Sequence, residues 1–248
     1  MRNVFFSMTI DQLSEQKKAE KNQVASYFNG MGFERWNRIY SESNEVNKVQ
    51  RNIRIGHQKT VDDVLSWINE SGDLSSLSFC DAGCGVGSLS IPLAQMGVGS
   101  ISASDISESM IRETKSRAEV AKLDLKKFSF HVSDLENLKG SFDTVICLDV
   151  FIHYPQNAAE EMVKHLCNLA KERLIVSFAP YTPILALLKK IGQLFPGPSK
   201  TTRAYTLREN GIILAAKESG FEVVRSKLNQ APFYFSKLIE FRKVRYNK

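Results

Sequence analysis

From Leu77 onward, short apolar runs alternate with amphipathic segments, and small or polar turns separate them. The runs LSFCDA, ISASD, FSFHVSD, FDTVICLD and RLIVSFAP predict strands at 77–82, 101–105, 128–134, 142–149 and 173–180. Between them, apolar residues recur three or four positions apart, which predicts helices. The clearest lies in 158–170, where one face carries Met162, Val163, Leu166 and Leu169. Strands that alternate with helices predict a parallel, doubly wound α/β sheet.

The rest of the chain is patterned differently. Residues 1–22 are polar and predict a frayed helical arm, and an aromatic and basic segment follows up to Ile55. Helical patterning begins again in KTVDDVLSWINE. After the fifth strand, a short helix framed by prolines precedes a last helix and two β-rich runs. We expect an N-terminal arm or lid over 1–56 and one α/β domain over 57–248, with a lid insert at about 180–206.

Composition narrows the class of protein only moderately. The 248 residues are 43% hydrophobic and 24% charged, which is typical of a globular chain. A net charge of +6 is compatible with nucleic acid, an anionic membrane surface or an acidic small substrate. No uncharged apolar run approaches the roughly 18 residues of a membrane span, and no signal peptide is evident, so we expect a cytoplasmic or stromal protein. The four cysteines lack paired spacing, which favours buried thiols over disulfides or zinc, and no metal site is predicted.

A glycine-rich turn, DAGCGVG, follows the first strand and opens a helix. The dinucleotide pattern G-x-G-x-x-G fails, because Ser88 occupies the third position counted from Gly83. The turn resembles the first motif of class I S-adenosylmethionine-dependent methyltransferases, with Asp81, Gly83, Gly85 and Gly87 at the motif positions. The resemblance implies S-adenosyl-L-methionine as cofactor and a Rossmann-like, mostly parallel seven-stranded sheet. An acid and close backbone carbonyls suit the ammonium of that cofactor.

Two further acids end strands on the same edge of the expected sheet. Asp105 lies about 20 residues after the turn, where an acid accepts hydrogen bonds from ribose hydroxyls. The resemblance places Ile106 against adenine, Asp134 on the adenine amino group with Leu135 alongside, and Leu148 in the same site. Either acid alone would more often be a helix cap. Three acids at three successive strand ends favour the cofactor site.

The residues after the fourth strand bear on the methyl acceptor. Methyltransferases of exocyclic base amines carry Asn/Asp-Pro-Pro-Tyr/Phe there, and cytosine-C5 enzymes carry Pro-Cys. This chain has Leu148-Asp149-Val150-Phe151, and Cys147 is not preceded by proline. A small-molecule acceptor is therefore favoured, and no nucleic-acid partner is expected.

Several longer blocks, including IRIGH, CDAGCGVGSLSIPLA, IHYPQN and LFPGPSKTTRAY, are similar to the magnesium-protoporphyrin IX O-methyltransferase family of chlorophyll biosynthesis. The similarity runs from about Tyr27 to the C-terminus. It implies methylation of one propionate of Mg-protoporphyrin IX, and it assigns the chemistry to His153 and Tyr27. A propionate is already ionised at neutral pH, so we expect His153 to orient the carboxylate rather than deprotonate it. The other readings are a capping His153 and a Tyr27 that packs the arm onto the sheet.

Two other regions are open to more than one interpretation. His57 and Arg54 approach either the cofactor carboxylate or the substrate, or else are surface charges. The insert carries an apolar helical face with Lys189, Lys190, Lys200 and Arg203. That face suits a porphyrin, a membrane surface or a pathway partner such as the preceding magnesium-insertion enzyme. Alternative functions are methylation of another small carboxylate, phenol or quinone precursor, and non-catalytic tetrapyrrole transport. We expect a monomer.

Overall fold

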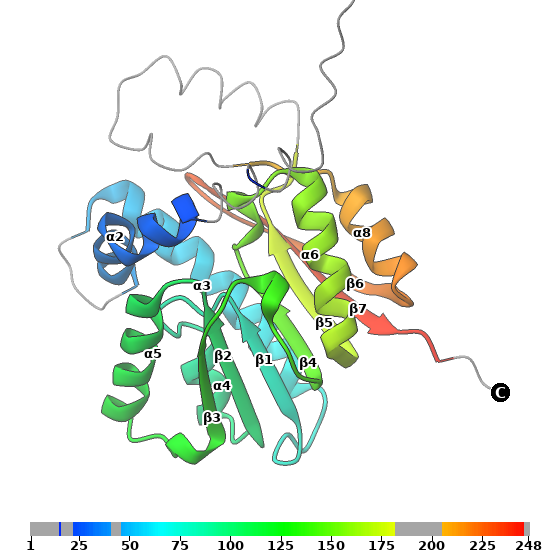
Figure 1. The fold of residues 1–248 in the computed structure, drawn as a ribbon, viewed down its shortest axis with the longest axis horizontal. Coiled ribbons are helices and arrows are strands. Elements are labelled where there is room, and N and C mark those ends of the chain that lie inside the picture. Colours follow the sequence, from blue (N-terminus) through cyan, green and yellow to red (C-terminus); the bar gives the residue numbers. More distant parts are fainter. Residues whose placement is uncertain (1–14, 16–21, 41–45, 182–204, 246–248) are drawn as a thin grey trace, which may run out of the picture.

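The sheet follows the α/β pattern that the sequence predicts. The computed structural model describes residue 15 and residues 22–40, 46–181 and 205–245. In these ranges, seven strands form one sheet in the order β3-β2-β1-β4-β5-β7-β6, with helices on both faces (Figure 1). Strands β1 to β5 are mutually parallel, and β7 runs antiparallel to both of its neighbours. The expected mostly parallel, seven-stranded sheet is confirmed.

The elements have the following bounds. The strands are β1 Ser78–Ala82, β2 Ser100–Asp105, β3 Phe128–Val132, β4 Phe142–Cys147, β5 Ala170–Phe178, β6 Phe221–Ala231 and β7 Tyr234–Lys243. The α-helices are α2 Met31–Ile39, α3 Lys48–Asn69, α4 Ser90–Gln95, α5 Glu108–Val120, α6 Gln156–Leu169 and α8 Glu209–Glu218. Short 3-10 helices are η1 Leu125–Lys127, η2 Leu135–Asn137 and η3 Phe151–His153. Residues 22–29 are also helical. The predicted lid helix and its Lys189, Lys190, Lys200 and Arg203 lie outside the described residues.

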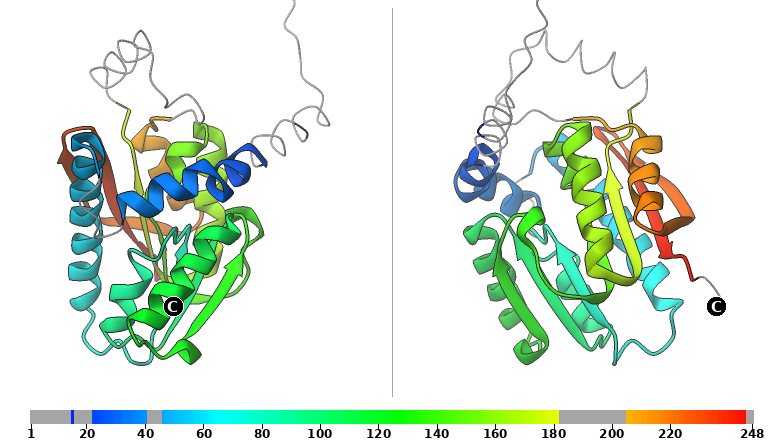
Figure 2. Two further views of the ribbon diagram at one scale, coloured as in Figure 1. Left: turned by 90° about the vertical axis from the view of Figure 1, so that its left-hand side faces the viewer. Right: turned by 45° about the vertical axis from the view of Figure 1, so that its right-hand side comes forward.

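Side-chain alternation along the strands divides the core into two layers. In β4, Val145 and Cys147 face the layer beneath α6 and α8, whereas Ile146 faces the layer beneath α3, α4 and α5. The right view of Figure 2 shows α6 and α8 together on their face of the sheet. On the opposite face, α3 packs against β6 and β7. Both sides of the central strands are therefore buried, as in other parallel sheets.

Helix α3 differs from the sequence prediction at its N-terminus. It begins at Lys48, where Asn47 and Gln50 form a reciprocal capping box, rather than at Lys59, where the helical pattern of the sequence begins. The predicted boundary between 56 and 57 therefore lies inside one continuous helix. Gly56 is required within it, because an added Cβ would lie 2.3 Å from the Tyr234 ring of β7. That glycine permits the close approach of α3 to the C-terminal hairpin.

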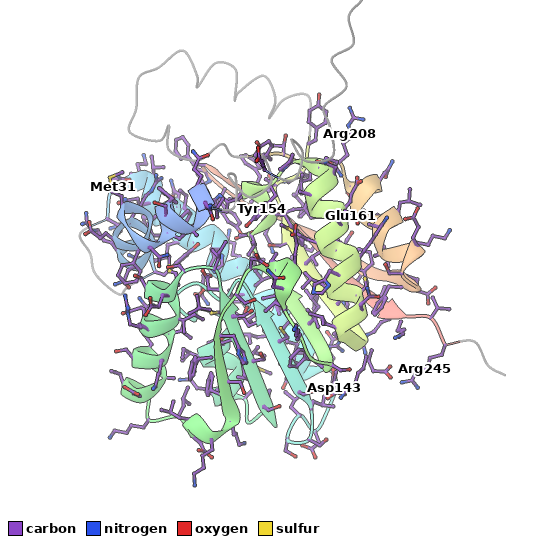
Figure 3. The ribbon with its side chains drawn as sticks, in the orientation of Figure 1. Met31, Asp143, Tyr154, Glu161, Arg208 and Arg245 are labelled. Carbon is purple, nitrogen blue, oxygen red and sulfur yellow. The ribbon has the colours of Figure 1, made fainter. Side chains whose placement is uncertain are left out.

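The carboxyl ends of β1 to β4 meet at one edge of the sheet, as parallel strands require. Asp143, at the start of β4, lies at the opposite end of the sheet from Tyr154, which follows that strand (Figure 3). Among the described residues, no helix is long and apolar enough to cross a membrane.

Candidate functional site

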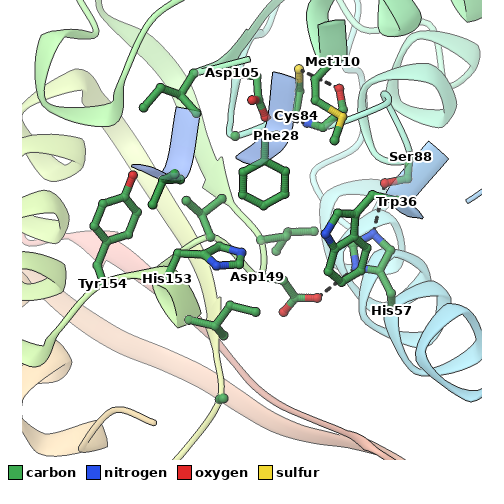
Figure 4. A pocket seen from close by; sticks show the side chains of 18 of the residues that line it. Phe28, Trp36, His57, Cys84, Ser88, Asp105, Met110, Asp149, His153 and Tyr154 are labelled. Atoms are coloured by element: carbon green, nitrogen blue, oxygen red, sulfur yellow. Dashed lines mark hydrogen bonds and ion pairs between the residues drawn. The ribbon is translucent and has the colours of Figure 1, made fainter. Parts of the chain in front are cut away.

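A cavity of about 860 Å³ lies at the carboxyl edge of the sheet (Figure 4). Its walls come from the segments that follow β1, β2, β3 and β4, from the N-terminal arm, and from the turn between β6 and β7. The volume is near the upper end of the roughly 300–1,000 Å³ range of ligand cavities. Most of the lining side chains are apolar or aromatic, and the polar ones gather at the strand ends.

The glycine turn exposes its backbone to this cavity. Gly83 and Gly85 both line it and have φ of +83° and +54°, a region that favours glycine. A Cβ on Gly83 would lie 2.2 Å from Val150, whereas nothing lies within 4 Å of the Cβ position of Gly85. The turn is therefore tightly packed behind Gly83 and open in front of Gly85. An open backbone at this point allows a ligand to approach closely.

Asp81 and Gly87, two other residues of the predicted motif, are not among the described residues that line the cavity. Asp81 is 2% exposed and accepts a 2.6 Å hydrogen bond from Ser90 Oγ of α4. Burial raises its pKa to about 6, although the Ser90 hydroxyl opposes this. Strand alternation turns the Asp81 side chain toward α4, so Asp81 positions the turn from behind. Contact between Asp81 and a cofactor stays a prediction.

The two later acids do lie in the cavity wall. Asp105 accepts hydrogen bonds from the amides of Gly85 (3.0 Å) and Ser107 (2.9 Å), which ties β2 to the glycine turn. Burial raises the pKa of Asp105 to about 6, although these amides lower it. Asp134 caps η2 by accepting from the Asn137 amide at 2.9 Å, so it is a helix cap as well as a wall residue. The predicted contacts Ile106, Leu135 and Leu148 also line the cavity.

A hydrogen-bonded cluster centred on Asp149 forms one side of the cavity. Asp149 Oδ2 accepts from Tyr234 OH (2.7 Å) and pairs with His57 Nδ1 (2.9 Å). Its Oδ1 accepts from Ser177 Oγ (2.7 Å) and Ser236 Oγ (2.9 Å). Burial opposes ionisation, but these hydrogen bonds and the nearby His57 lower the pKa of Asp149 to about 2. This carboxylate is therefore a fixed anion.

His57 joins the same cluster to the glycine turn. Its second ring nitrogen, Nε2, lies 3.0 Å from Ser88 Oγ, and both residues line the cavity. The interpretation of His57 as a surface charge is therefore wrong. Arg54, its companion candidate, donates instead to the carbonyls of Ile39 and Arg38 at the end of α2. Sequence reasoning assigned no role to Asp149; the one available signal was a lone acid ending an apolar strand.

His153 lies on the same edge of the sheet, within η3. Its ring meets that of Phe28 edge to face, with centroids 5.0 Å apart. Burial lowers the pKa of His153 to about 4, although the charge of Asp149 raises it. Its Nδ1 is buried and has no hydrogen-bond partner among the described residues. His153 is thus a neutral imidazole at the cavity wall, with one buried nitrogen that no described residue satisfies.

The described part of the N-terminal arm covers the cavity. Val24, Phe28, Trp36 and Tyr40 contribute to its lining. The arm is held onto α5, since Ser107 Oγ lies 2.9 Å from the Phe28 carbonyl and Arg117 donates to the Tyr40 carbonyl at 3.0 Å. The left view of Figure 2 shows these helical segments lying across one end of α5.

Tyr27, the predicted catalytic tyrosine, is not among the described residues that line the cavity. It packs edge to face against Phe28, with ring centroids 5.1 Å apart, and none of the ring contacts among the described residues joins it to His153. Phe28, the next residue, makes the ring contact with His153. The catalytic role of Tyr27 stays a prediction. No group of three or more potential metal-ligating side chains occurs in the described part of the chain.

Comparison with known proteins agrees with this geometry. Residues 147–243 match the family model "Magnesium-protoporphyrin IX methyltransferase C-terminus", and residues 79–173 match a methyltransferase domain model. A chloroplastic magnesium protoporphyrin IX methyltransferase of Arabidopsis thaliana is 49% identical, over 92% of this chain and 73% of that protein. The magnesium-protoporphyrin O-methyltransferase of Synechocystis is 51% identical, over 89% of this chain and 95% of that protein.

A solved structure is also similar over nearly the whole fold. The crystal structure of magnesium protoporphyrin IX methyltransferase from Synechocystis PCC 6803 with bound SAH has a TM-score of 0.84 and 48% sequence identity. The match covers 90% of this chain and 100% of that one. Because high identity extends across most of this chain and most of each relative, the chain belongs to the magnesium-protoporphyrin IX methyltransferase family.

Proposed function

We propose that this protein transfers a methyl group from S-adenosyl-L-methionine to a propionate carboxylate of Mg-protoporphyrin IX, giving the monomethyl ester. The observation that carries the proposal is one cavity with two chemically different parts. One part is the open glycine turn with Asp105 and Asp134, and the other is an aromatic wall beside His153. The names of the relatives support this pairing of cofactor and substrate.

The residues present fit the cofactor. The open space in front of Gly85 admits a ligand against the turn, and the Asp105 carboxylate is placed to accept hydrogen bonds from hydroxyl groups there. Ile106 and Leu135 offer apolar surface for a flat ring, with Asp134 beside them. When bound, this cofactor supplies an electrophilic methyl group.

His153 aims the carboxylate in this proposal. With a pKa near 4, its imidazole is neutral at pH 7 and is too weak a base to offer much advantage in proton removal. Its unsatisfied Nδ1 suits a hydrogen bond to the substrate, and the ring is held from the side by Phe28. The aromatic arm excludes water, which favours a reaction in which a carboxylate and a cationic methyl donor lose their charges. Alignment and desolvation are thus the main contributions of the chain.

The direct test is to incubate the protein with S-adenosyl-L-methionine and Mg-protoporphyrin IX and to identify the monomethyl ester by mass. We expect His153→Ala to lower kcat by about 100-fold with little change in cofactor affinity, since orientation is lost. His131→Ala is the matched control, because His131 is exposed on β3 and does not line the cavity. Cofactor binding without any ester would refute the substrate assignment.

Further predictions accompany this function. We infer that the protein works in the cytoplasm or the plastid stroma, which agrees with the chloroplastic label of the Arabidopsis relative. Contact with the preceding magnesium-insertion enzyme, peripheral membrane contact and a monomeric state all stay predictions. Sedimentation of the purified protein, alone and with liposomes, measures the last two.

A further inference from the structure

The turn between β6 and β7 consists of two residues, Pro232 and Phe233, since Ala231 pairs directly with Tyr234. The proline ring holds its own φ near −65°, and Phe233 has a φ of +67°. A negative φ followed by a positive one is the order of a type II turn, whose second central position favours glycine or asparagine. A bulky aromatic residue therefore occupies a position at which L side chains are strained.

The fold gains little from this ring. Phe233 is 67% exposed, so most of its apolar surface faces water rather than the core. None of the ring-to-ring contacts among the described residues involves Phe233. It nevertheless lines the cavity, together with Pro232 and Phe235. Backbone strain together with an exposed apolar ring at a cavity wall is typical of a ligand contact.

Neighbouring contacts keep the turn in this strained shape. Tyr234, the next residue, donates to Asp149 and lies 2.9 Å from Thr60 Oγ1 of α3. On the other strand, Asn229 donates to the same Thr60 Oγ1 at 3.2 Å. The hairpin is thus fixed to α3 and to the Asp149 cluster immediately beside Phe233. A ring placed on such a rigid support is positioned before any ligand arrives, which reduces the entropy lost on binding.

We propose that Phe233 is a substrate-specificity residue whose ring packs against the face of the tetrapyrrole macrocycle at the cavity wall. A porphyrin presents a large, flat, apolar π-surface, and an aromatic ring offers contact area and favourable ring geometry. The inference rests on the proposed function, because it concerns the substrate end of the same cavity. The strained conformation at Phe233 is maintained for binding and not for folding.

Phe233→Gly separates binding from stability because the two effects have opposite signs. Glycine relieves the positive φ, so the melting temperature is expected to stay the same or to rise. Removal of the ring is expected to raise the KM and the Kd for Mg-protoporphyrin IX by about fivefold or more. The kcat at saturating substrate and the cofactor Kd are expected to stay unchanged. Phe233→Tyr keeps the ring and should keep the substrate KM close to that of the original protein.

Lys122→Gly is the matched control. Lys122 is exposed after α5, has a φ of +56° and does not line the cavity, so it allows the same relief of strain without touching the substrate. The melting temperature of the Lys122→Gly protein should stay the same or rise, as for Phe233→Gly, and its KM for the substrate should be unchanged. An unchanged macrocycle Kd in Phe233→Gly, or a loss of stability and cofactor affinity together, overturns the proposal.

Macrocycle binding is followed separately from turnover, by titration of the porphyrin absorbance band. If the protein without substitutions forms no monomethyl ester, that result contradicts the proposed function alone. The macrocycle Kd of Phe233→Gly still decides the role of Phe233 in that case.

Discussion

Asp149→Asn removes the charge at the centre of the hydrogen-bonded cluster while keeping nearly the same side-chain volume. The carboxylate accepts from three hydroxyls and pairs with His57 Nδ1, at distances of 2.7 to 2.9 Å. An asparagine has only one acceptor oxygen, so its amide nitrogen must face groups that donate in the original protein. The substitution therefore tests whether the cluster is held together by the charge or only by packing.

The expected cost follows from the pKa of Asp149. Its pKa of about 2 lies well below the roughly 3.9 of a free aspartate, so folding favours the charged carboxylate over the protonated form. Since a tenfold change in an ionisation constant corresponds to about 1.36 kcal/mol, this preference contributes about 2.5 kcal/mol to the free energy of unfolding at pH 7. We expect Asp149→Asn to lower the free energy of unfolding by about that amount, which is a large share of the roughly 5–15 kcal/mol typical of a domain.

The pH dependence of the free energy of unfolding distinguishes a charge effect from a packing effect. A carboxyl group whose pKa is lowered by folding stabilises the protein above its unfolded pKa, and this contribution is lost as the pH falls through the folded pKa. Urea denaturation of both proteins should therefore show a constant difference above about pH 4, shrinking toward pH 2. A difference below about 0.5 kcal/mol at neutral pH, or one that does not change with pH, would refute the reasoning.

Asp143→Asn is the control at the other end of β4. Its carboxylate accepts from the amide and hydroxyl of Ser78 and pairs with Lys171, but 24% of its side chain is exposed. Solvent screening weakens such a pair, so we expect a cost of about 1 kcal/mol or less.

Three other measurements test the same framework. Gly83→Ala should lower the free energy of unfolding, measured by urea denaturation, by about 2 kcal/mol or more, because the new Cβ would lie 2.2 Å from Val150 and the backbone has a positive φ. A second substitution in the same chain, Val150→Ala, should recover part of this loss. His153 stays neutral in the folded protein down to about pH 4, whereas it takes up a proton in the unfolded chain below about pH 6.5. The free energy of unfolding should therefore fall by up to about 3 kcal/mol between pH 6.5 and pH 4 because of this residue, and a His153→Gln protein with the same pH profile would contradict this. Glu240→Gln should cost about 3 kcal/mol in the same assay, because it leaves the 3% exposed guanidinium of Arg173 without this ion-pair partner. Burial raises the pKa of Glu240 and so offsets part of the cost, and a cost near zero would show that the pair is dispensable.

Local sequence patterns were sufficient for most of the fold. The alternation of strand and helix, the glycine turn after β1 and the acids after β2 and β3 are all readable within short windows, and each lies at the predicted edge of the sheet. They are predictable because period, turn chemistry and capping depend on neighbouring residues. The start of α3 was missed even so, although the capping residues Asn47 and Gln50 were present in the sequence.

Contacts between distant segments were decided by the tertiary structure. His57, Asp149 and Tyr234 come together only because α3, the end of β4 and the hairpin of β6 and β7 converge on one point. No window of the chain contains them all. Likewise, the packing of the arm on α5 determines that Phe28 rather than Tyr27 lies beside His153, since neighbouring helical residues point in different directions.

The sequence by itself therefore determined the class of fold, the cofactor turn and the family, because these depend on spacing along the chain. The tertiary structure decided which side chains form the cavity wall. Asp149 was one acid in an apolar run until four partners from other segments surrounded it, and Phe233 was one aromatic residue in a turn until its positive φ and exposure were seen. Charge stabilisation and backbone strain both depend on what lies nearby in space, which a linear sequence does not show.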